Sequence, residues 1–585
     1  MGLRQKLCLS GIFLLLMVCL SWVLIVKPPF GSPDELNHTA RAYGILNGYM
    51  LLKPVGDDGT SGTYVDHTLF DAAKIYRDGI ADSGDARSFK SGIEKMKELK
   101  WSGHDSAIQI PNVTFYAPLV YFPQSLAYGI GKAFDINFYD TYIISNYLTF
   151  AVCIALLFIA YFIYPIPPLA MFFITMPMMA YQLMSPTIDG ISVALTVLAL
   201  SILFKLEKNP QTEKYLSLLI LMSVCIFASA GSRANLLLMS FIPLWLYYSN
   251  RKKSNLVLFV LQIISTFGWT VFNIVSVHDS AMGRHPGYSN FDLIIYYISH
   301  PVELVSVIFN TLTNSALVTG YYHSFIGVLG TLDAPIKDNQ RNVFTISMLF
   351  IFLSSLIIRG NNRIGKFEVF IILLALSGAL LIFPALLVQW TSFPATYIDG
   401  VQGRYFIIPA IIFGYAFSVN AKHQSKYVFL ILLLAVFSTY TVHSSMAQRY
   451  LSSKVELPHA SEISSVAEVK NIKADEVVQY HLDVPKGAMK SVAFYMANYN
   501  NTSKGIASLN ACSDGQCVET SLNINNMVDN SFVEFKFNKP LNIVSHDLQL
   551  QFKFMPENGS QPLVIWEFKR NLDDVKVPKM VIDYY

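Results

Sequence analysis

Residues 367–388 read FEVFIILLALSGALLIFPALLV, a run in which Glu368 is the one charged side chain. As an α-helix, such a run is long enough to cross about 30 Å of hydrocarbon. Comparable runs recur from the N-terminus to about residue 446. They lie near 7–26, 114–133, 138–162, 166–183, 188–204, 215–231, 234–249, 255–276, 297–320, 342–358, 367–388, 404–419 and 427–446. The sequence therefore predicts a polytopic α-helical membrane protein.

The composition agrees with this class and excludes others. Of 585 residues, 53% are hydrophobic and 14% are charged, whereas soluble domains carry about 25% charged residues. The formal net charge of +3 is too small to indicate a nucleic-acid partner. The sequence has no glycine-rich nucleotide loop and no His/Cys spacing typical of a metal site. No cofactor is therefore predicted.

Lysines and arginines set the expected orientation, because cytoplasmic loops hold an excess of them. Arg4 and Lys6 place the N-terminus inside, and four short loops are basic: Lys205/Lys208/Lys214, Arg251/Lys252/Lys253, Arg359/Arg363/Lys366 and Lys422/Lys426. Because an even number of crossings must separate two cytoplasmic loops, 297–320 is expected to lie along the outer interface. Either 114–133 or 166–183 is expected not to cross fully. About 11 spans remain, and the C-terminus is outside.

This topology divides the chain at about residue 446. Residues 1–446 form the predicted membrane domain. Its run 7–26 is interpreted as a first span, because no small-x-small cleavage pattern of a signal peptide follows it. Residues 27–112 form a long first extracytoplasmic loop, and residues 447–585 form a separate extracytoplasmic domain.

The C-terminal domain is predicted to be an antiparallel β-sandwich. Leu548, Leu550, Phe552 and Phe554 alternate with polar residues, and about eight such runs lie between 464 and 570. The sequence Cys512-Ser-Asp-Gly-Gln-Cys517 favours a hairpin disulfide outside the cytoplasm.

The first loop opens with Ser32-Pro33-Asp34-Glu35, and His38 and Arg41 follow. Ser32 and Glu35 match a capping box, so a helix is expected to begin at Pro33. Asp34, His38 and Arg41 then lie on one face. An ionised Asp34 at the membrane edge can act as a general base. Alternatively, Asp34 and Glu35 only cap a surface helix. A divalent metal at the pair also remains open.

Several charged side chains lie at external helix ends, where the positive-inside tendency disfavours cations. Arg404 lies in Gln402-Gly403-Arg404-Tyr405, and a guanidinium beside glycines can bind a phosphate bidentately. Interfacial snorkelling is the alternative. Asp189 is a candidate for substrate binding, although it can equally cap a helix. The other candidates for substrate binding are His38, Arg41, Arg233, Arg284, His285, Gln402 and Tyr405. The acid lies on the expected external side, and the chain has no nucleotide-binding motif. Both observations favour a lipid-linked donor, which the bilayer itself delivers.

These motifs together resemble a bacterial family catalogued as domain of unknown function 2142, over about residues 1–450. The resemblance lies in Pro33-Asp34-Glu35 with His38 and Arg41-Ala42-Tyr43, Tyr116–Pro123, Met176-Pro177-Met178 followed by Ser185 and Asp189, Gly327–Asp333, and Gly400–Pro409. Arg233 departs from the pattern, because a lysine followed by a proline-tyrosine pair is expected there.

That family is similar to GT-C glycosyltransferases, which have a many-helix membrane core. The resemblance implies an inverting transfer of a sugar from a polyprenyl-phosphate donor to an extracytoplasmic acceptor, such as O-antigen or a cell-wall glycan. Asp34, with Glu35, would be catalytic, while Arg404 would hold the leaving phosphate. It also implies a bacterial inner membrane location and, as partners, a flippase and a donor-synthesising transferase. Two alternatives remain: a flippase or transporter of lipid-linked glycans, and a polysaccharide polymerase or ligase.

The predicted topology can be tested at the C-terminus. A reporter that is active only in the cytoplasm, fused after Tyr585, is expected to be silent, because an odd number of crossings from a cytoplasmic N-terminus leaves this end outside. Reporter activity in whole cells would contradict the topology, and a fusion after Lys253 serves as the positive control.

Overall fold

The protein is described by a computed structural model that covers residues 3–51, 53–55, 59–82, 85–113, 116–277, 288–359, 364–417, 427–458, 463–474, 476–500, 502–570 and 575–584. The chain forms two compact units. The helical unit contains Met1–Tyr76 and Ile93–Arg449, and the β unit contains Arg77–Gly92 and Tyr450–Tyr585. The sequence pattern did not indicate that part of the first loop belongs to the β unit.

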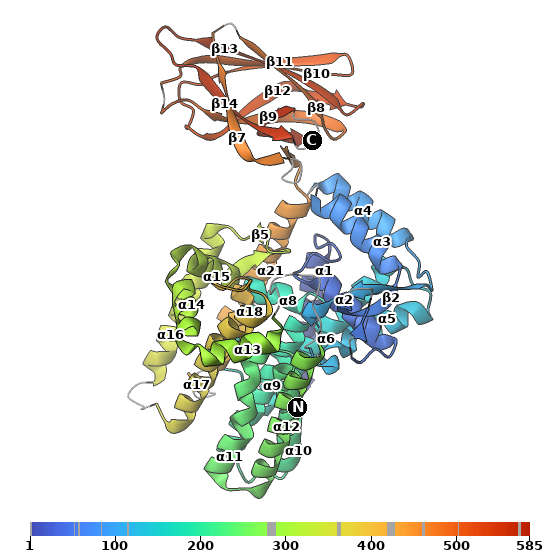
Figure 1. Cartoon of the computed structure of the whole chain (residues 1–585), viewed down its shortest axis with the longest axis vertical. Coiled ribbons are helices and arrows are strands. Elements are labelled where there is room, and N and C mark those ends of the chain that lie inside the picture. Colours follow the sequence, from blue (N-terminus) through green and yellow to red (C-terminus); the bar gives the residue numbers. More distant parts are fainter. Residues whose placement is uncertain are drawn as a thin grey trace. The chain divides into compact units, whose positions relative to one another are not determined.

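The helical unit is built from many helices of unequal length (Figure 1). The longer ones are α1 (Leu3–Leu24), α6 (Phe138–Ile163), α9 (Ile188–Lys208), α10 (Tyr215–Ala230), α12 (Lys253–Ser276), α16 (Asp338–Arg359), α17 (Lys366–Leu380) and α21 (Val428–Tyr450). The shorter α-helices are α2 (Glu35–Leu46), α3 (Thr68–Ile75), α4 (Ala86–Glu98), α5 (Phe122–Ala133), α7 (Pro168–Thr175), α8 (Pro177–Leu183), α11 (Ile242–Asn250), α13 (Asn290–Ser299), α14 (Pro301–Thr313), α15 (Ser315–Gly327), α18 (Ile382–Gln389) and α19 (Ile407–Ala416). Short 3-10 helices include η3 (Pro118–Tyr121), η4 (Ala234–Phe241) and η5 (Gly403–Phe406).

In the described part of the chain, fewer helices have the length and hydropathy of a membrane span than the sequence predicted. Within the described residues, 6 helices are long and apolar enough to cross a membrane, or up to 7 if the bent pair α13–α14 counts as one span. Three shorter apolar helices lie at 14–24, 215–230 and 403–416. This count is lower than the predicted number of about 11 because the runs 215–231, 234–249 and 404–419 form α-helices of 16, 9 and 10 residues. The run 166–183 is split at Met176, and 297–320 contains a bend of 100° after Ser299.

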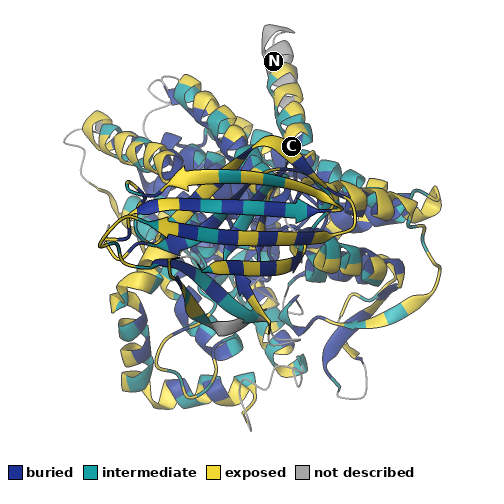
Figure 2. Ribbon diagram, turned by 90° about the horizontal axis from the view of Figure 1, so that it is seen from above, coloured by how far each residue is buried: buried dark blue, intermediate teal, exposed yellow. Residues whose placement is uncertain are grey.

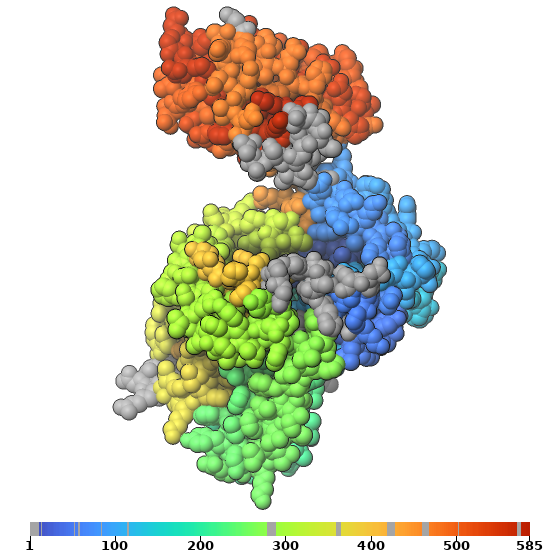
Figure 3. Space-filling model, viewed as in Figure 1, coloured from blue at the N-terminus to red at the C-terminus, as the bar shows by residue number. Residues whose placement is uncertain are grey.

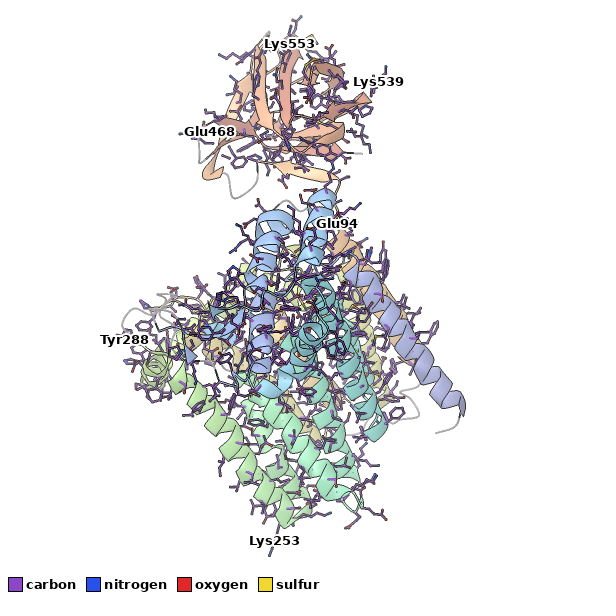
Figure 4. The ribbon with its side chains drawn as sticks, turned by 90° about the vertical axis from the view of Figure 1, so that its right-hand side faces the viewer. Glu94, Lys253, Tyr288, Glu468, Lys539 and Lys553 are labelled. Carbon is purple, nitrogen blue, oxygen red and sulfur yellow. A yellow bond between two sulfur atoms is a disulfide. The ribbon has the colours of Figure 1, made fainter. Side chains whose placement is uncertain are left out.

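Helix α9 forms the centre of the helical unit. Of the residues in its most apolar stretch, 83% are buried. The helix packs against α6, α10 and α19. In helices α12 and α16, by contrast, most residues of the apolar stretch are not buried, as expected of lipid-facing spans. Figure 4 shows Lys253 at the foot of α12, in agreement with a basic loop at that helix end.

The part of the first loop that belongs to the helical unit contains a small sheet. Strands β1 (Lys53–Pro54), β2 (Ser61–Asp66) and β3 (Asp105–Gln109) form an antiparallel sheet. Helix α2 packs between β2 and α5, and Gly44 leaves room for Thr63 of β2, where a Cβ would clash. A two-stranded ladder, β4 (Val328–Leu329) with β5 (Ala334–Pro335), follows α15.

The β unit consists of antiparallel sheets, as predicted. Its strands are β6 (Lys454–Leu457), β7 (Ile463–Ile472), β8 (Val477–Asp483), β9 (Gly487–Ala497), β10 (Gly505–Ser513), β11 (Gln516–Asn523), β12 (Ser531–Ile543), β13 (Asp547–Pro556), β14 (Leu563–Arg570), β15 (Lys576–Pro578) and β16 (Met580–Tyr584). One sheet has the order β11-β10-β13-β8. The other has the order β15-β14-β9-β16-β6, with β12 paired to β9 and β7 paired to β14.

The two sheets enclose a hydrophobic core. Leu548, Leu550, Phe552 and Phe554 of β13 are all buried, as their period of two requires. Figure 2 shows the same alternation of buried and exposed residues along neighbouring strands. Phe552 meets Phe494 and Phe535 at ring-centroid distances of 5.7 and 5.6 Å, edge to face. Aromatic rings from both sheets therefore close the core.

Cys512 and Cys517 are directly opposite each other across the β10–β11 hairpin and form a disulfide. Replacing both with serine is expected to lower the free energy of unfolding by about 2 kcal/mol, since so short a loop has little closure entropy to lose. The β unit should still fold, and thermal unfolding in detergent measures the difference. Alkylation of both thiols in the non-reduced, denatured protein would contradict the bridge.

Candidate functional site

The start of the first loop is organised around the buried carboxylate of Glu35. It accepts hydrogen bonds from the backbone N–H groups of Phe30 at 3.2 Å and Ser32 at 2.9 Å. The Lys27 ammonium lies 3.1 Å from Glu35 Oε2, and both side chains are fully buried. The Tyr142 hydroxyl on α6 donates to Glu35 Oε1 at 2.5 Å. Glu35 therefore holds the loop between α1 and α2 in one conformation.

Two further contacts attach this loop to the α8–α9 corner. The Tyr181 hydroxyl donates to the Gly31 carbonyl, and the hydroxyls of Ser32 and Ser185 lie 2.7 Å apart. The loop is thus fixed beside Asp189, the second residue of α9.

Asp34 has an unusual backbone conformation. Its φ of 57° and ψ of 12° are left-handed, immediately before α2 begins at Glu35. The expected helix start at Pro33 is therefore wrong, and the Asp34 side chain makes no capping hydrogen bond. Asp tolerates this conformation better than most residues, but strained positions concentrate at functional sites. Here the conformation directs the carboxylate away from α2 and toward Arg404.

Arg404 joins two carboxylates that are far apart in the sequence. Its Nη2 donates to Asp34 Oδ2 at 2.7 Å, and its Nη1 lies 3.4 Å from Asp189 Oδ2. Asp189 also forms an ion pair with Arg233. The four side chains form a row of alternating charge, Asp34–Arg404–Asp189–Arg233, in which Arg404 is 4% exposed and Asp34 is 40% exposed.

Gly403 explains how Arg404 reaches this position. A Cβ at residue 403 would lie 1.9 Å from the Phe325 backbone nitrogen and 2.3 Å from the Tyr321 carbonyl oxygen. The Gly403 N–H donates to Ser324 Oγ at 2.9 Å. Only glycine lets η5 approach α15 so closely, and this contact places the next residue in the site.

The same region is covered by an apolar cluster from α13, α14 and α18, with residues near 393–401 packed against it. In Figure 3 the segment near residue 400 lies beside the green segments of α13–α15. This cluster fixes the long connection before η5.

The surroundings of Asp34 and His38 determine whether each side chain is charged. Burial works to raise the pKa of the Asp34 carboxyl, but Arg404 outweighs it, so the pKa lies below its ordinary value. Burial lowers the pKa of His38 to about 3. His38 Nδ1 lies 2.8 Å from the Tyr121 hydroxyl, and its ring stacks on Tyr116 at 5.7 Å. At neutral pH, Asp34 is therefore ionised and His38 is uncharged.

A pocket of about 140 Å³ opens beside the charged row. Arg233, Tyr116 and Tyr405 line it together with amide side chains, Asn235, Asn273 and Gln389. The Nε atoms of Arg233 and Arg404 are buried and have no hydrogen-bond partner among the described residues. A cationic group, phenols and amides together suit an anion with several oxygen atoms.

The other predicted site residues divide into three groups. Arg41 is fully buried and donates to the carbonyls of Tyr49 at 3.0 Å and Met50 at 2.8 Å, so it shapes the loop and does not join Asp34. Gln402 borders η5, and its buried Oε1 has no partner among the residues described. Arg284 and His285 lie outside the described residues.

The structure does not favour a metal at the Asp34/Glu35 pair. Glu35 faces Lys27, and Asp34 faces Arg404. In the part of the chain that the structure describes, no group of three His, Cys, Asp or Glu side chains could hold a metal ion.

Comparison with known proteins identifies the family of this chain. Residues 15–414 match the family described as "Predicted membrane protein (DUF2142)". The chain belongs to this family. No curated protein matches the DUF2142 protein by sequence. Among solved structures, ArnT from Cupriavidus metallidurans in the apo state is similar at a TM-score of 0.30 and 10% identity, over 76% of this chain and 78% of that chain.

Sequence reasoning missed Lys27, Tyr142 and Tyr121 as supports of the site. Lys27 carried a signal, because a lysine after the first span, on the expected external side, goes against the positive-inside tendency. Tyr121 lies in the Tyr116–Pro123 motif. Tyr142 lies in an ordinary apolar helix, and nothing in its sequence context points to Glu35.

Glu35→Ala is expected to destabilise this DUF2142 protein by about 3–5 kcal/mol, because it leaves the buried Lys27 ammonium unpaired. Asp34→Ala, at a partly exposed position, should cost much less. The measurement is thermal unfolding in detergent of both variants and of Lys27→Met/Glu35→Leu, which removes both charges and should recover part of the stability, since Tyr142 and two backbone N–H groups still lose their acceptor. A Glu35→Ala protein as stable as the parent would contradict the structural role.

Proposed function

We propose that this protein is an inverting glycosyltransferase that moves a sugar from a polyprenyl-phosphate donor to a hydroxyl group of an extracytoplasmic glycan. The observation that carries the proposal is the Asp34 carboxylate, ionised and partly exposed, joined by Arg404 to a buried row of charges beside an Arg233-lined pocket. The family resemblance supplies the sugar chemistry.

The reaction needs a base and an anion site within reach of each other. In the proposed step, Asp34 takes the proton of the acceptor hydroxyl, whose oxygen forms the new bond to the anomeric carbon. The bond from that carbon to the phosphate oxygen breaks, and its electron pair leaves with the polyprenyl phosphate. Attack opposite the leaving group inverts the configuration. Asp34 at the exposed end of the row and Arg233 in the pocket are suited to these two tasks.

Arg233 and Arg404 have different roles in this proposal. Arg233 lines the pocket and binds the donor phosphate there. Arg404 already contacts Asp34 and Asp189, so an arriving phosphate competes for its N–H groups. Weaker pairing between Arg404 and Asp34 raises the pKa of the carboxyl and makes it a stronger base. Donor binding would thereby activate Asp34.

Glu35 receives a different role from the one that the motif suggested. Its carboxylate is saturated by Lys27, Tyr142 and two backbone N–H groups. We therefore propose that Asp34 alone is the base and that Glu35 positions it.

Asp34→Asn is expected to lower transfer by about 10²–10⁴-fold, the usual contribution of positioned proton transfer, with unfolding temperature unchanged. The assay incubates purified protein in nanodiscs with radiolabelled polyprenyl-phosphate sugars and crude surface polysaccharide, then measures label in the polymer. Asp71→Asn, an exposed acid on α3, is the matched control. An equally stable and fully active Asp34→Asn protein would favour the flippase alternative.

Arg233→Lys and Arg404→Lys are expected to separate the two arginine roles. Lysine keeps the charge but loses the bidentate geometry. Arg233→Lys should mainly raise the KM for the donor, because it changes the pocket. Arg404→Lys should lower kcat as well, because it also changes the partner of Asp34. Unchanged kinetics in both variants, at equal protein abundance, would remove the proposed phosphate site.

A further inference from the structure

The β unit displays an aromatic cluster that the proposed sugar transfer does not use. Tyr495 of β9 and Phe532 of β12 are directly paired across the strands, and their ring centroids are 5.1 Å apart. Trp566 of β14 lies 6.3 Å from Tyr495. The rings of Phe532 and Trp566 are inclined at 70° and 61° to Tyr495. Their neighbours Phe494 and Ile565 are buried, so this cluster lies on the outer face of the sheet.

The ammonium group of Lys579 lies close to two of these rings. The Lys579 ammonium lies 4.5 Å from the Tyr495 ring centroid and 5.7 Å from the Phe532 centroid. Its backbone is fixed at the β15–β16 junction, where Lys579 N donates to Trp566 O and Tyr495 N donates to Lys579 O, both at 2.8 Å. Among the described residues, no carboxylate forms an ion pair with Lys579. The positive charge is therefore not neutralised within the sheet.

The cluster combines exposed apolar surface with a polar border. Phe532 is 42% exposed, and Val469, paired with Trp566 across β7 and β14, is 51% exposed. Trp566 Nε1 donates to Asn530 Oδ1 at 3.2 Å. On the same strand as Phe532, the Glu534 carboxylate accepts a hydrogen bond from the Ser491 hydroxyl and forms an ion pair with Lys536. Exposed aromatic surface with a polar rim is typical of a binding surface.

We propose that the cluster of Tyr495, Phe532, Trp566 and Lys579 binds an acidic glycan. The C–H face of a sugar ring is weakly positive and packs on the negative face of an aromatic ring. A carboxylate or phosphate on the same sugar pairs with Lys579, and Asn530 can meet a hydroxyl. The rings are fixed in a sheet by edge-to-face packing and a hydrogen bond, which suits a rigid sugar better than a fluid bilayer. This binding does not depend on Asp34.

The test uses the full-length protein in zwitterionic nanodiscs, because the β unit includes residues from the first loop and a C-terminal fragment lacks them. Fluorescent oligogalacturonate, hyaluronan oligosaccharide and a phosphorylated mannan oligosaccharide are the acidic probes, and maltohexaose is the neutral one. Thermophoresis should detect binding of at least one acidic probe that is weakened by salt. Phe532→Ser should weaken it by about tenfold, and Lys579→Gln by about threefold with a flatter salt dependence.

Matched variants keep the proposal falsifiable. Lys539→Gln and Ile506→Ser change exposed residues of the same unit outside the cluster, Ile506 being on β10 of the other sheet, and should leave binding unchanged; Figure 4 labels Lys539. Phe532→Tyr should retain binding, and unfolding temperatures exclude misfolding. Lys579→Gln serves if Phe532→Ser does not fold. Asp34→Asn should bind normally, which separates this proposal from the catalytic one.

Three outcomes would overturn the proposal. The first is that no acidic probe binds. The second is that Phe532→Ser and Lys579→Gln, both folded, bind as tightly as the parent. The third is that the nanodisc protein instead captures phosphatidylglycerol vesicles through Phe532 and Lys579, which would make the cluster a membrane contact.

Discussion

The buried pair of Lys27 and Glu35 is the interaction on which the site depends. Neither side chain reaches solvent, so each charge would be costly alone. Glu35 compensates by accepting four donors at once: an ammonium, a phenol and two backbone N–H groups. These bonds define the turn between α1 and α2. The left-handed conformation of Asp34 follows from that turn, and with it the direction of the one carboxylate in the loop that meets Arg404.

The row from Asp34 to Arg233 obeys the same electrostatic constraint. Charges within an apolar bundle need partners of opposite sign, and alternation gives each interior member two of them. Asp189 lies between Arg404 and Arg233, while the ends of the row differ. Asp34 is accessible, and Arg233 faces a pocket. An arrangement that neutralises its interior and leaves an acid and a cation at its ends is suited to bind an anion near a base.

The β unit is stabilised by a core of its own. Phe494, Phe535 and Phe552 pack at its centre, and Arg87, from the first loop, places its guanidinium 4.9 Å from the Tyr584 ring centroid. The unit therefore needs chain from two distant parts of the sequence. Its outer aromatic cluster is structurally separate from this core, since the rings alternate with the buried residues along each strand. Substitutions on that face can therefore leave the core packing intact.

The sequence by itself determined the membrane class, the antiparallel β-sheets at the C-terminus and the candidates Asp34, Asp189, Arg233 and Arg404. Hydrophobic runs and period-two alternation are local signals, and a charge at an apolar helix end is visible without a structure. The tertiary structure decided the rest. Among the described residues, several apolar runs form helices shorter than a full span, and the Arg41 guanidinium donates hydrogen bonds to backbone carbonyls. Glu35 became a support because Lys27 and Tyr142 meet it from other helices. These contacts join residues up to 107 positions apart, and the partner of a charge depends on packing between helices, which no local pattern encodes.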